Sequence, residues 1–215
     1  SMVAHYTAAK RRRSDDAYTP GGKAGRRPDR ATIVYSRKLR QLYPDSNIVI
    51  GGLEASLRRF AHYDYWDDAV RPSILLDSQA DLLLYGMGEK VITQLTQRLR
   101  QGEALETIRD LRGCCYLCRQ EEIPQDSVSC ASFHKVSENK ESYAKAHQIQ
   151  TEWQDAVYGK TIVQKQTDTL YLVQNPPMPS LTREELDEVF DLPFTRTYHP
   201  SYEAMGGVDA IKEVE

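Results

Sequence analysis

The chain has no apolar run that approaches the roughly 18 residues of a membrane-spanning helix, and its mean hydropathy is −0.60. The N-terminus lacks the apolar core and the small-residue cleavage site of a secretory signal. The four cysteines have no even spacing, so they provide no disulfide framework and favour a reducing compartment. We therefore expect a soluble, cytoplasmic protein without a membrane segment.

Positive charge is scarce outside the front of the chain. Residues 1–59 hold 13 Lys or Arg against 5 Asp or Glu, whereas the remainder holds 15 against 26. Clustered cations such as Lys10–Arg13 could bind phosphates or RNA. A pI near 6.0 favours a solvated segment instead. A phosphate-binding loop of the Walker type is excluded at Gly21–Lys23, because neither Ser nor Thr follows the lysine.

Two strand–glycine–helix units predict an α/β domain over residues 31–120, after a basic segment over 1–30. A helix near Ala31–Leu42 precedes the first strand, Ile48–Ile50, which ends at Gly51–Gly52 before a helix over 54–60. The second strand, Leu82–Tyr85, ends at Gly86–Gly88 before a helix that stops at Gly102. This alternation predicts a parallel sheet with right-handed crossovers. Ile74–Leu76 and Cys114–Arg119 are candidates for further strands.

Residues 121–174 form a predicted extension of a long helix and a hairpin. The helix runs from about Asn139 to Tyr158, and the hairpin pairs Thr161–Gln166 with Thr169–Val173. Residues 175–215 are a proline-rich connector followed by a helix whose capping box starts at Thr182. That helix is predicted to turn Leu186, Val189 and Phe190 inward.

The sheet is expected to be incomplete at its N-terminus, because no strand-like run precedes Ile48. Such a sheet would present an unpaired edge, so we expect the chain to cover it or to form a homo-oligomer through it.

Several short motifs are similar to those of the bacterial YgiQ-type radical-SAM proteins. They are Asp16–Pro20, Gly25–Ala31, Gly51–Arg59, Ala61–Trp66, Tyr85–Glu89, Asn175–Pro177 and Leu192–Pro193. The resemblance covers nearly the whole chain and is weakest over 121–160. It implies an enzyme that cleaves S-adenosylmethionine reductively at a [4Fe-4S] cluster to form a 5′-deoxyadenosyl radical. It also implies a Rossmann- or flavodoxin-like front domain, of the type that binds cobalamin in related enzymes.

The chain departs from this family's chemistry in two patterns. A radical-SAM cluster takes three thiolates from Cys-x3-Cys-x2-Cys, but Cys114, Cys115 and Cys118 give Cys-Cys-x2-Cys, and Cys130 is the next thiol. We therefore predict no metal site and no cofactor within these residues. The cobalamin lower-ligand pattern Asp-x-His-x2-Gly is also missing, which favours a scaffold that no longer binds a corrinoid, although a corrinoid could bind without that ligand.

Candidate binding residues follow the two strands. Ligands of open parallel sheets gather at the carboxyl ends of strands, which makes Gly51, Gly52, Gly86 and Gly88 candidate cofactor-binding residues. The alternative is a structural role, in which glycine permits a positive φ or close helix packing there.

The stretch Arg58–Asp68 combines guanidinium, imidazole, carboxylate and aromatic groups. Arg58 and Arg59 are candidates for binding a substrate phosphate or carboxylate, with Tyr65 and Trp66 stacked on it. His62 and Asp64 are candidate acid–base residues. An equally good interpretation is a network of ion pairs and rings that holds a long loop.

The resulting prediction is the non-catalytic N-terminal region of a YgiQ-like radical-SAM enzyme. Its partner would be its own radical-SAM barrel, absent from this chain, and the cluster and S-adenosylmethionine would belong to the full-length protein. A nucleotide-, RNA- or corrinoid-binding module is the alternative.

Overall fold

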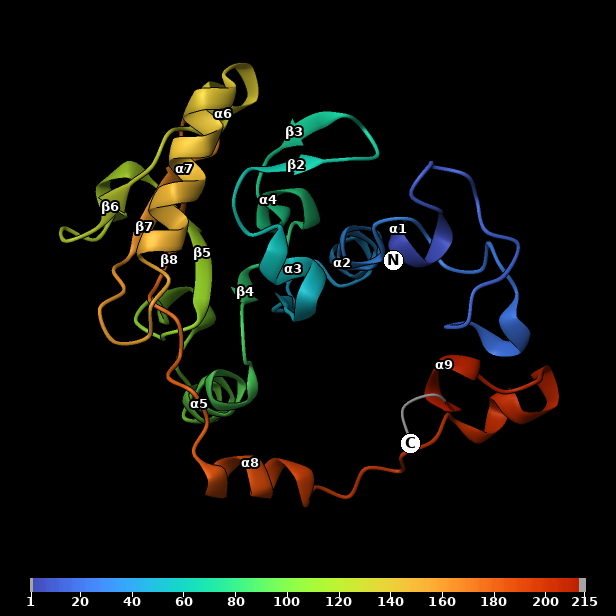
Figure 1. The fold of residues 1–215 in the computed structure, drawn as a ribbon. Helices are drawn as coiled ribbons and strands as arrows, with labels where there is room; N and C mark the ends of the chain where they lie inside the picture. The colour runs from blue at the N-terminus through green and yellow to red at the C-terminus, as the bar shows by residue number, and fades with distance from the viewer. Residues whose placement is uncertain (1, 213–215) are drawn as a thin grey trace.

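The structure is a computed structural model that describes residues 2–212, so the last residues of the predicted connector, 213–215, lie outside it. A mixed six-stranded sheet occupies the middle of the chain and carries helices on both faces (Figure 1). The sheet order is β1-β4-β5-β8-β7-β6. Its strands are β1 Val49–Ile50, β4 Leu82–Leu84, β5 Cys114–Cys118, β6 Val128–Ser129, β7 Ile162–Lys165 and β8 Tyr171–Gln174. A separate hairpin pairs β2 His62–Asp64 with β3 Ala69–Arg71.

The predicted parallel sheet is correct only at its two edges. β1 pairs with β4 in parallel and β6 pairs with β7 in parallel, whereas β4–β5, β5–β8 and β7–β8 are antiparallel. β5 runs antiparallel to β4 because of the segment after α5 (Glu89–Arg100), which buries Leu105, Ile108 and Leu111 as it returns along the sheet. The amide of Tyr85 donates to Gly113 O at 2.8 Å, so β5 begins beside the end of β4 and runs back.

Most of the predicted helices are confirmed. The larger helices of the structure are α2 Ala31–Leu42, α3 Gly52–Leu57, α4 Ile74–Ser78, α5, α6 Phe133–Glu138, α7 Lys140–Glu152 and α8 Arg183–Phe190. Short helices α1 Met2–His5 and α9 Asp209–Lys212 lie near the ends, and 3-10 turns span Pro20–Gly22, Leu105–Thr107, Gln120–Glu122 and Pro200–Met205. No helix within residues 2–212 is long and apolar enough to cross a membrane.

Two predictions of secondary structure are wrong. Ile74–Leu76 is helix, because Ser73 caps α4 by accepting a hydrogen bond from the Leu75 amide. The long helix predicted from Asn139 to Tyr158 is shorter: α7 ends at Glu152, and the Asp155 carboxylate then accepts from two amides in a turn.

The core forms one layer on each face of the sheet. On one face α2, α3, α4 and α7 contribute Ile33, Ala55, Leu75 and Ile149, among others. On the other face α5 contributes Val91 and Leu95. Burial of this apolar area at about 25 cal/mol per Å² is the main favourable term for the sheet.

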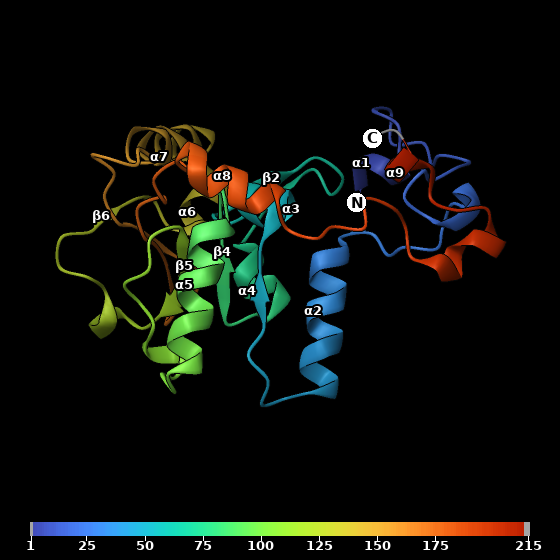
Figure 2. The same ribbon diagram turned by 90° about the horizontal axis from the view of Figure 1, so that it is seen from below.

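The two ends of the described chain lie together, away from the sheet (Figures 1 and 2). The Gly21 amide donates to Gly207 O at 2.9 Å, and the Ala210 amide donates to Ala17 O at 3.0 Å. We call residues 2–30 with 200–212 the terminal lobe. Residues 191–199 connect α8 to it, and we call them the arm.

Candidate functional site at the carboxyl ends of two strands

The parallel pairing of β1 and β4 brings the four candidate glycines to one edge of the sheet. Val49 pairs with Leu82 and Ile50 with Leu83, so the turns that follow both strands lie beside each other. The Gly86 amide donates to Ser56 Oγ at 3.2 Å, which ties the β4 turn to α3. The sequence analysis placed both turns at the carboxyl ends of their strands, and this geometry is consistent with that.

The four glycines differ in what requires them. Gly52 and Gly86 have φ of +79° and +71°, a conformation in which other residues are strained. Gly51 is extended, and an added Cβ would lie 3.3 Å from Leu84 O. Gly88 has φ of −84° and open space around an added Cβ, so neither conformation nor packing demands glycine there.

Arg59 lies beside these turns. Its guanidinium stacks 4.8 Å from the Tyr85 ring centroid. It donates to Gln174 Oε1, to Ser56 O and, at 3.4 Å, to Gln154 Oε1. Among residues 2–212 no carboxylate forms an ion pair with Arg59, whereas Gln174, which is fully buried, leaves Nε2 without a hydrogen-bond partner there. An arginine without a bound carboxylate retains its charge for an anion.

Arg58 is oriented differently from its neighbour. Its Nη1 lies 3.4 Å from Glu54 and 4.0 Å from Asp64. Asp64 is buried and also pairs with Arg30 at 3.1 Å. Burial raises the pKa of Asp64, but hydrogen bonds from Arg30 and from the amides of Asp67 and Trp66 outweigh burial, so its pKa is lowered.

His62 lies on the same strand, β2, as Asp64, but the hydrogen bond of its imidazole is to a backbone oxygen and not to the Asp64 carboxylate. Its Nδ1 lies 3.0 Å from Phe60 O. Burial lowers the pKa of His62, partly offset by that hydrogen bond. The imidazole is therefore neutral at neutral pH.

Tyr65 and Trp66 contact the front of the chain. Tyr65 donates its hydroxyl to Ala8 O at 2.7 Å, and Lys10 Nζ lies 4.6 Å from the Tyr65 ring centroid. The Trp66 ring lies 5.0 Å from that of Tyr6. These aromatic residues, proposed from the sequence to stack on a substrate, hold part of the basic segment.

A second network holds the terminal lobe itself. The buried Asp16 carboxylate accepts two hydrogen bonds of 2.8 Å from Arg27, and His5 Nδ1 lies 2.7 Å from Asp29. Burial raises the pKa of Asp16 and of Asp29, but hydrogen bonds from Arg27, and from His5 and Tyr6, lower each below its ordinary value. The basic segment is thus neutralised in part by its own acids.

The three clustered thiols do not converge. β5 alternates, so Cys115 packs into the core layer with α2–α4 while Cys114 and Cys118 pack into the layer with α5. Burial raises the pKa of Cys114 to about 12 and that of Cys118 to about 11, and also raises the pKa of Cys115. Iron–sulfur ligation needs thiolates that face one cluster, so this set does not fit a [4Fe-4S] group.

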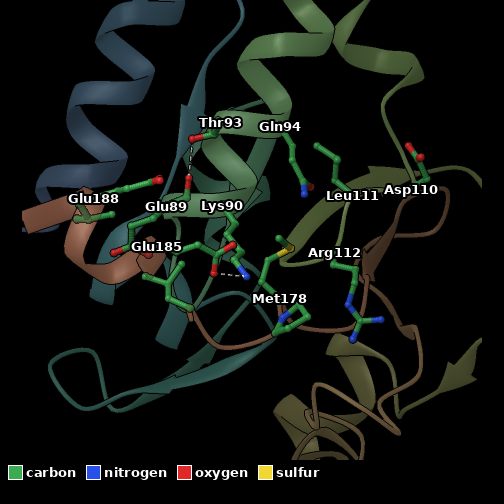
Figure 3. Close-up of a pocket in the computed structure, with 13 residues that line it drawn as sticks. Glu89, Lys90, Thr93, Gln94, Asp110, Leu111, Arg112, Met178, Glu185 and Glu188 are labelled. Atoms are coloured by element: carbon green, nitrogen blue, oxygen red, sulfur yellow. Dashed lines mark hydrogen bonds and ion pairs between the residues drawn. The ribbon is translucent and has the colours of Figure 1, made fainter. Parts of the chain in front are cut away.

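A pocket of about 650 Å³ lies between α5 and α8, next to the end of β4 (Figure 3). Lys90 and Glu185 point toward each other in it, with Nζ and Oε2 2.6 Å apart. The Arg112 guanidinium donates to the backbone oxygens of Pro177 and Ala156. Lys90 is thus neutralised by a carboxylate, and this ion pair fixes α8 to α5. Arg112 donates only to neutral backbone oxygens.

Residues 1–215 match the family described as Radical SAM N-terminal. The chain belongs to this family. It is similar to UPF0313 proteins of Clostridium botulinum strain 657, at 58% identity over 215 residues, and of Clostridium perfringens strain 13, at 52%. All of this chain is covered, but only 34% and 32% of those relatives. This Radical SAM N-terminal chain thus spans about a third of their length, and the family resemblance read from the motifs is confirmed.

No solved structure matches this Radical SAM N-terminal chain. The expectation of a Rossmann- or cobalamin-binding-like fold is therefore not supported by any similar solved structure, and it stays a prediction.

The sequence interpretation missed several groups that build the site. Ser56, Tyr85 and Gln174 surround Arg59, and Arg30 pairs with Asp64. Gln164 and Gln174 are buried polar residues inside strand-type runs. A glutamine buried in a strand needs a hydrogen-bond partner. Its presence in an apolar run was therefore the sequence signal that could have pointed to a polar contact there.

Replacing Asp64 with Asn should reduce the free energy of unfolding by about 2 kcal/mol at pH 7, because Arg30 loses its buried carboxylate and keeps only the more exposed Asp67 at 2.8 Å. The pKa of Asp64 is lowered by folding, so its contribution is present above the unfolded pKa of about 4 and is lost as the pH falls through the lower folded pKa. Urea unfolding across this pH range measures it.

Asp187→Asn is the matched control, because Asp187 is 67% exposed and 3.9 Å from Arg183. It should hardly change stability. Equal losses in the two variants, or an acid sensitivity that Asp64→Asn leaves unchanged, would contradict a buried ion pair.

Replacing Gly52 with Ala should cost about 1 kcal/mol, because its φ is +79°. Gly88→Ala meets neither strain nor crowding and should leave stability unchanged. Urea unfolding of both variants compares them, and a similar loss at Gly88 would show that its glycine is structural.

Proposed function

We propose that this chain is the non-catalytic N-terminal domain of a UPF0313 radical-SAM protein whose full-length form cleaves S-adenosylmethionine at a [4Fe-4S] cluster. The observation that carries the proposal is the arrangement of the thiols. Cys114 and Cys115 face opposite sides of the sheet, and burial raises their pKa values. The cluster would then be bound by the two-thirds of the protein that the relatives have beyond this chain.

Within that domain, Arg59 is our proposed binding residue for an anionic group of the substrate. It lies at the strand ends, where open sheets bind ligands, and no described carboxylate neutralises it. Gly88 borders the same edge and would allow close approach of a ligand to the backbone. Arg58 and Asp64 are instead ion-paired, and Tyr65 and Trp66 contact the basic segment, which favours a positioning role for all four.

The full-length protein carrying Cys114→Ala, Cys115→Ala and Cys118→Ala should retain its iron and its formation of 5′-deoxyadenosine. The reason is that these thiols pack into two separate core layers. Iron analysis and product measurement after anaerobic reconstitution test this, with circular dichroism to establish folding. Loss of iron from a folded variant would overturn the proposal.

The control is the same protein with Cys130→Ala alone. Cys130 lies outside β5, and burial raises its pKa to about 12, so it too should be inert. A full-length wild-type protein that forms no 5′-deoxyadenosine under reducing conditions would refute the proposed reaction itself.

A further inference from the structure

The outer face of α3 is apolar and uncovered. Leu53 is 82% exposed and Leu57 is 75% exposed, and their i, i+4 spacing puts both on one face of the helix. Met87, 50% exposed, follows the adjacent strand β4. Single exposed apolar side chains are ordinary, but here three gather at the edge that carries the candidate site.

A second apolar surface lies on α8 and the arm. The sequence pattern predicted Leu186 and Phe190 to face inward, and this is wrong: they are 39% and 62% exposed. Glu185 and Val189 line the pocket against α5 instead, so Leu186 and Phe190 lie on a different face of α8. Leu192 and Phe194 continue this surface along the arm at 51% and 57% exposure.

The elements that carry the two surfaces lie on the same side of the molecule. In Figure 1 α8 and the start of the arm lie below α3, and in Figure 2, seen from below, the end of α8 lies in front of α3. We call Leu53, Leu57, Met87, Phe190, Leu192 and Phe194 the apolar face; each is at least half exposed.

The arm is held at both ends. Lys90 pairs with Glu185 at its α8 end, and the Gly21–Gly207 hydrogen bond fixes the terminal lobe at the other. Residues 191–197 between these anchors are all exposed. Ordering a backbone costs roughly 1–2 kcal/mol per residue, and the described chain offers these residues little burial in return. A partner that covers them would supply it.

We propose that the apolar face is the docking surface for the remainder of the full-length protein, the two-thirds that the relatives possess beyond this chain. The inference rests on the proposed function and adds to it the surface through which the two parts meet. A remainder of that length is large enough to form at least one further domain. Exposed apolar area of this kind marks protein contact sites.

Covalent linkage favours this occupant over a second copy of the chain. A tethered domain meets its docking surface at an effective concentration of about millimolar. A second copy would have to compete at the concentration of the protein in solution. Burial of Leu53 and Leu57 would stabilise either contact by roughly the same amount per side chain, so the tether decides between them.

Thiol labelling of the full-length protein tests the docking surface. Leu57→Cys and Phe190→Cys are introduced separately, and Val157→Cys serves as the matched control because Val157 is 77% exposed on the turn after α7. Modification is followed peptide by peptide, so other cysteines of the protein do not interfere. If the remainder covers the apolar face, the thiols introduced by L57C and F190C should react at least about tenfold more slowly than the thiol introduced by V157C.

Two results would overturn the inference. Labelling of L57C and F190C as fast as that of V157C would show that the apolar face is free in the full-length protein. Protection that disappears on dilution, together with a dimeric mass that falls to the monomer, would identify a second copy as the occupant. Formation of 5′-deoxyadenosine by the wild-type protein is measured separately, so failure of the docking surface is distinguishable from failure of the proposed reaction.

Discussion

Two residue pairs, Val49 with Leu82 and Ile50 with Leu83, determine where the chemistry of this chain can lie. Because β1 and β4 run in parallel, both glycine turns emerge at one edge, and both following helices start there. An antiparallel pairing would have sent the two turns to opposite ends of the sheet. The open Gly88, the uncompensated Arg59 and the exposed leucines of α3 share an edge for this reason.

The charged residues of the next segment serve mainly to hold the chain together. The Asp64 carboxylate joins Arg30, from the start of α2, to the β2–β3 hairpin, and Arg58 approaches it from the end of α3. Removing a buried charge from water is costly, and the pair is stable only because several donors converge on one carboxylate. The dense mixture of polar side chains in Arg58–Asp68 suggests catalysis when only the sequence is considered. In the structure it is explained by contacts among α2, α3 and the β2–β3 hairpin.

How much could be predicted depended on whether the signal was local. The turn positions at Gly51 and Gly86, and the α8 capping box at Thr182, are local signals, and the structure confirms them. The direction of β5 was not local: it follows from the buried return of residues 101–113. The strand candidate Ile74–Leu76 is apolar in either conformation, and only the Ser73 cap selects helix. For the candidate site, the glycines were proposed because each pair follows a predicted strand, which is a local signal, whereas Gln174 and Tyr85 reach Arg59 from distant positions in the chain.

The apolar face and the candidate site belong to one argument because they share the strand ends. A domain that covers Leu53 and Leu57 necessarily approaches the edge where Arg59 and Gly88 lie. Ligand sites form preferentially where domains meet, since each side contributes part of the enclosure. An anion bound at that junction would lose water on both sides, which strengthens its attraction to the guanidinium of Arg59. On this view the exposed surface of the chain is half of an enclosure, to which Arg59 contributes a guanidinium that no described carboxylate neutralises.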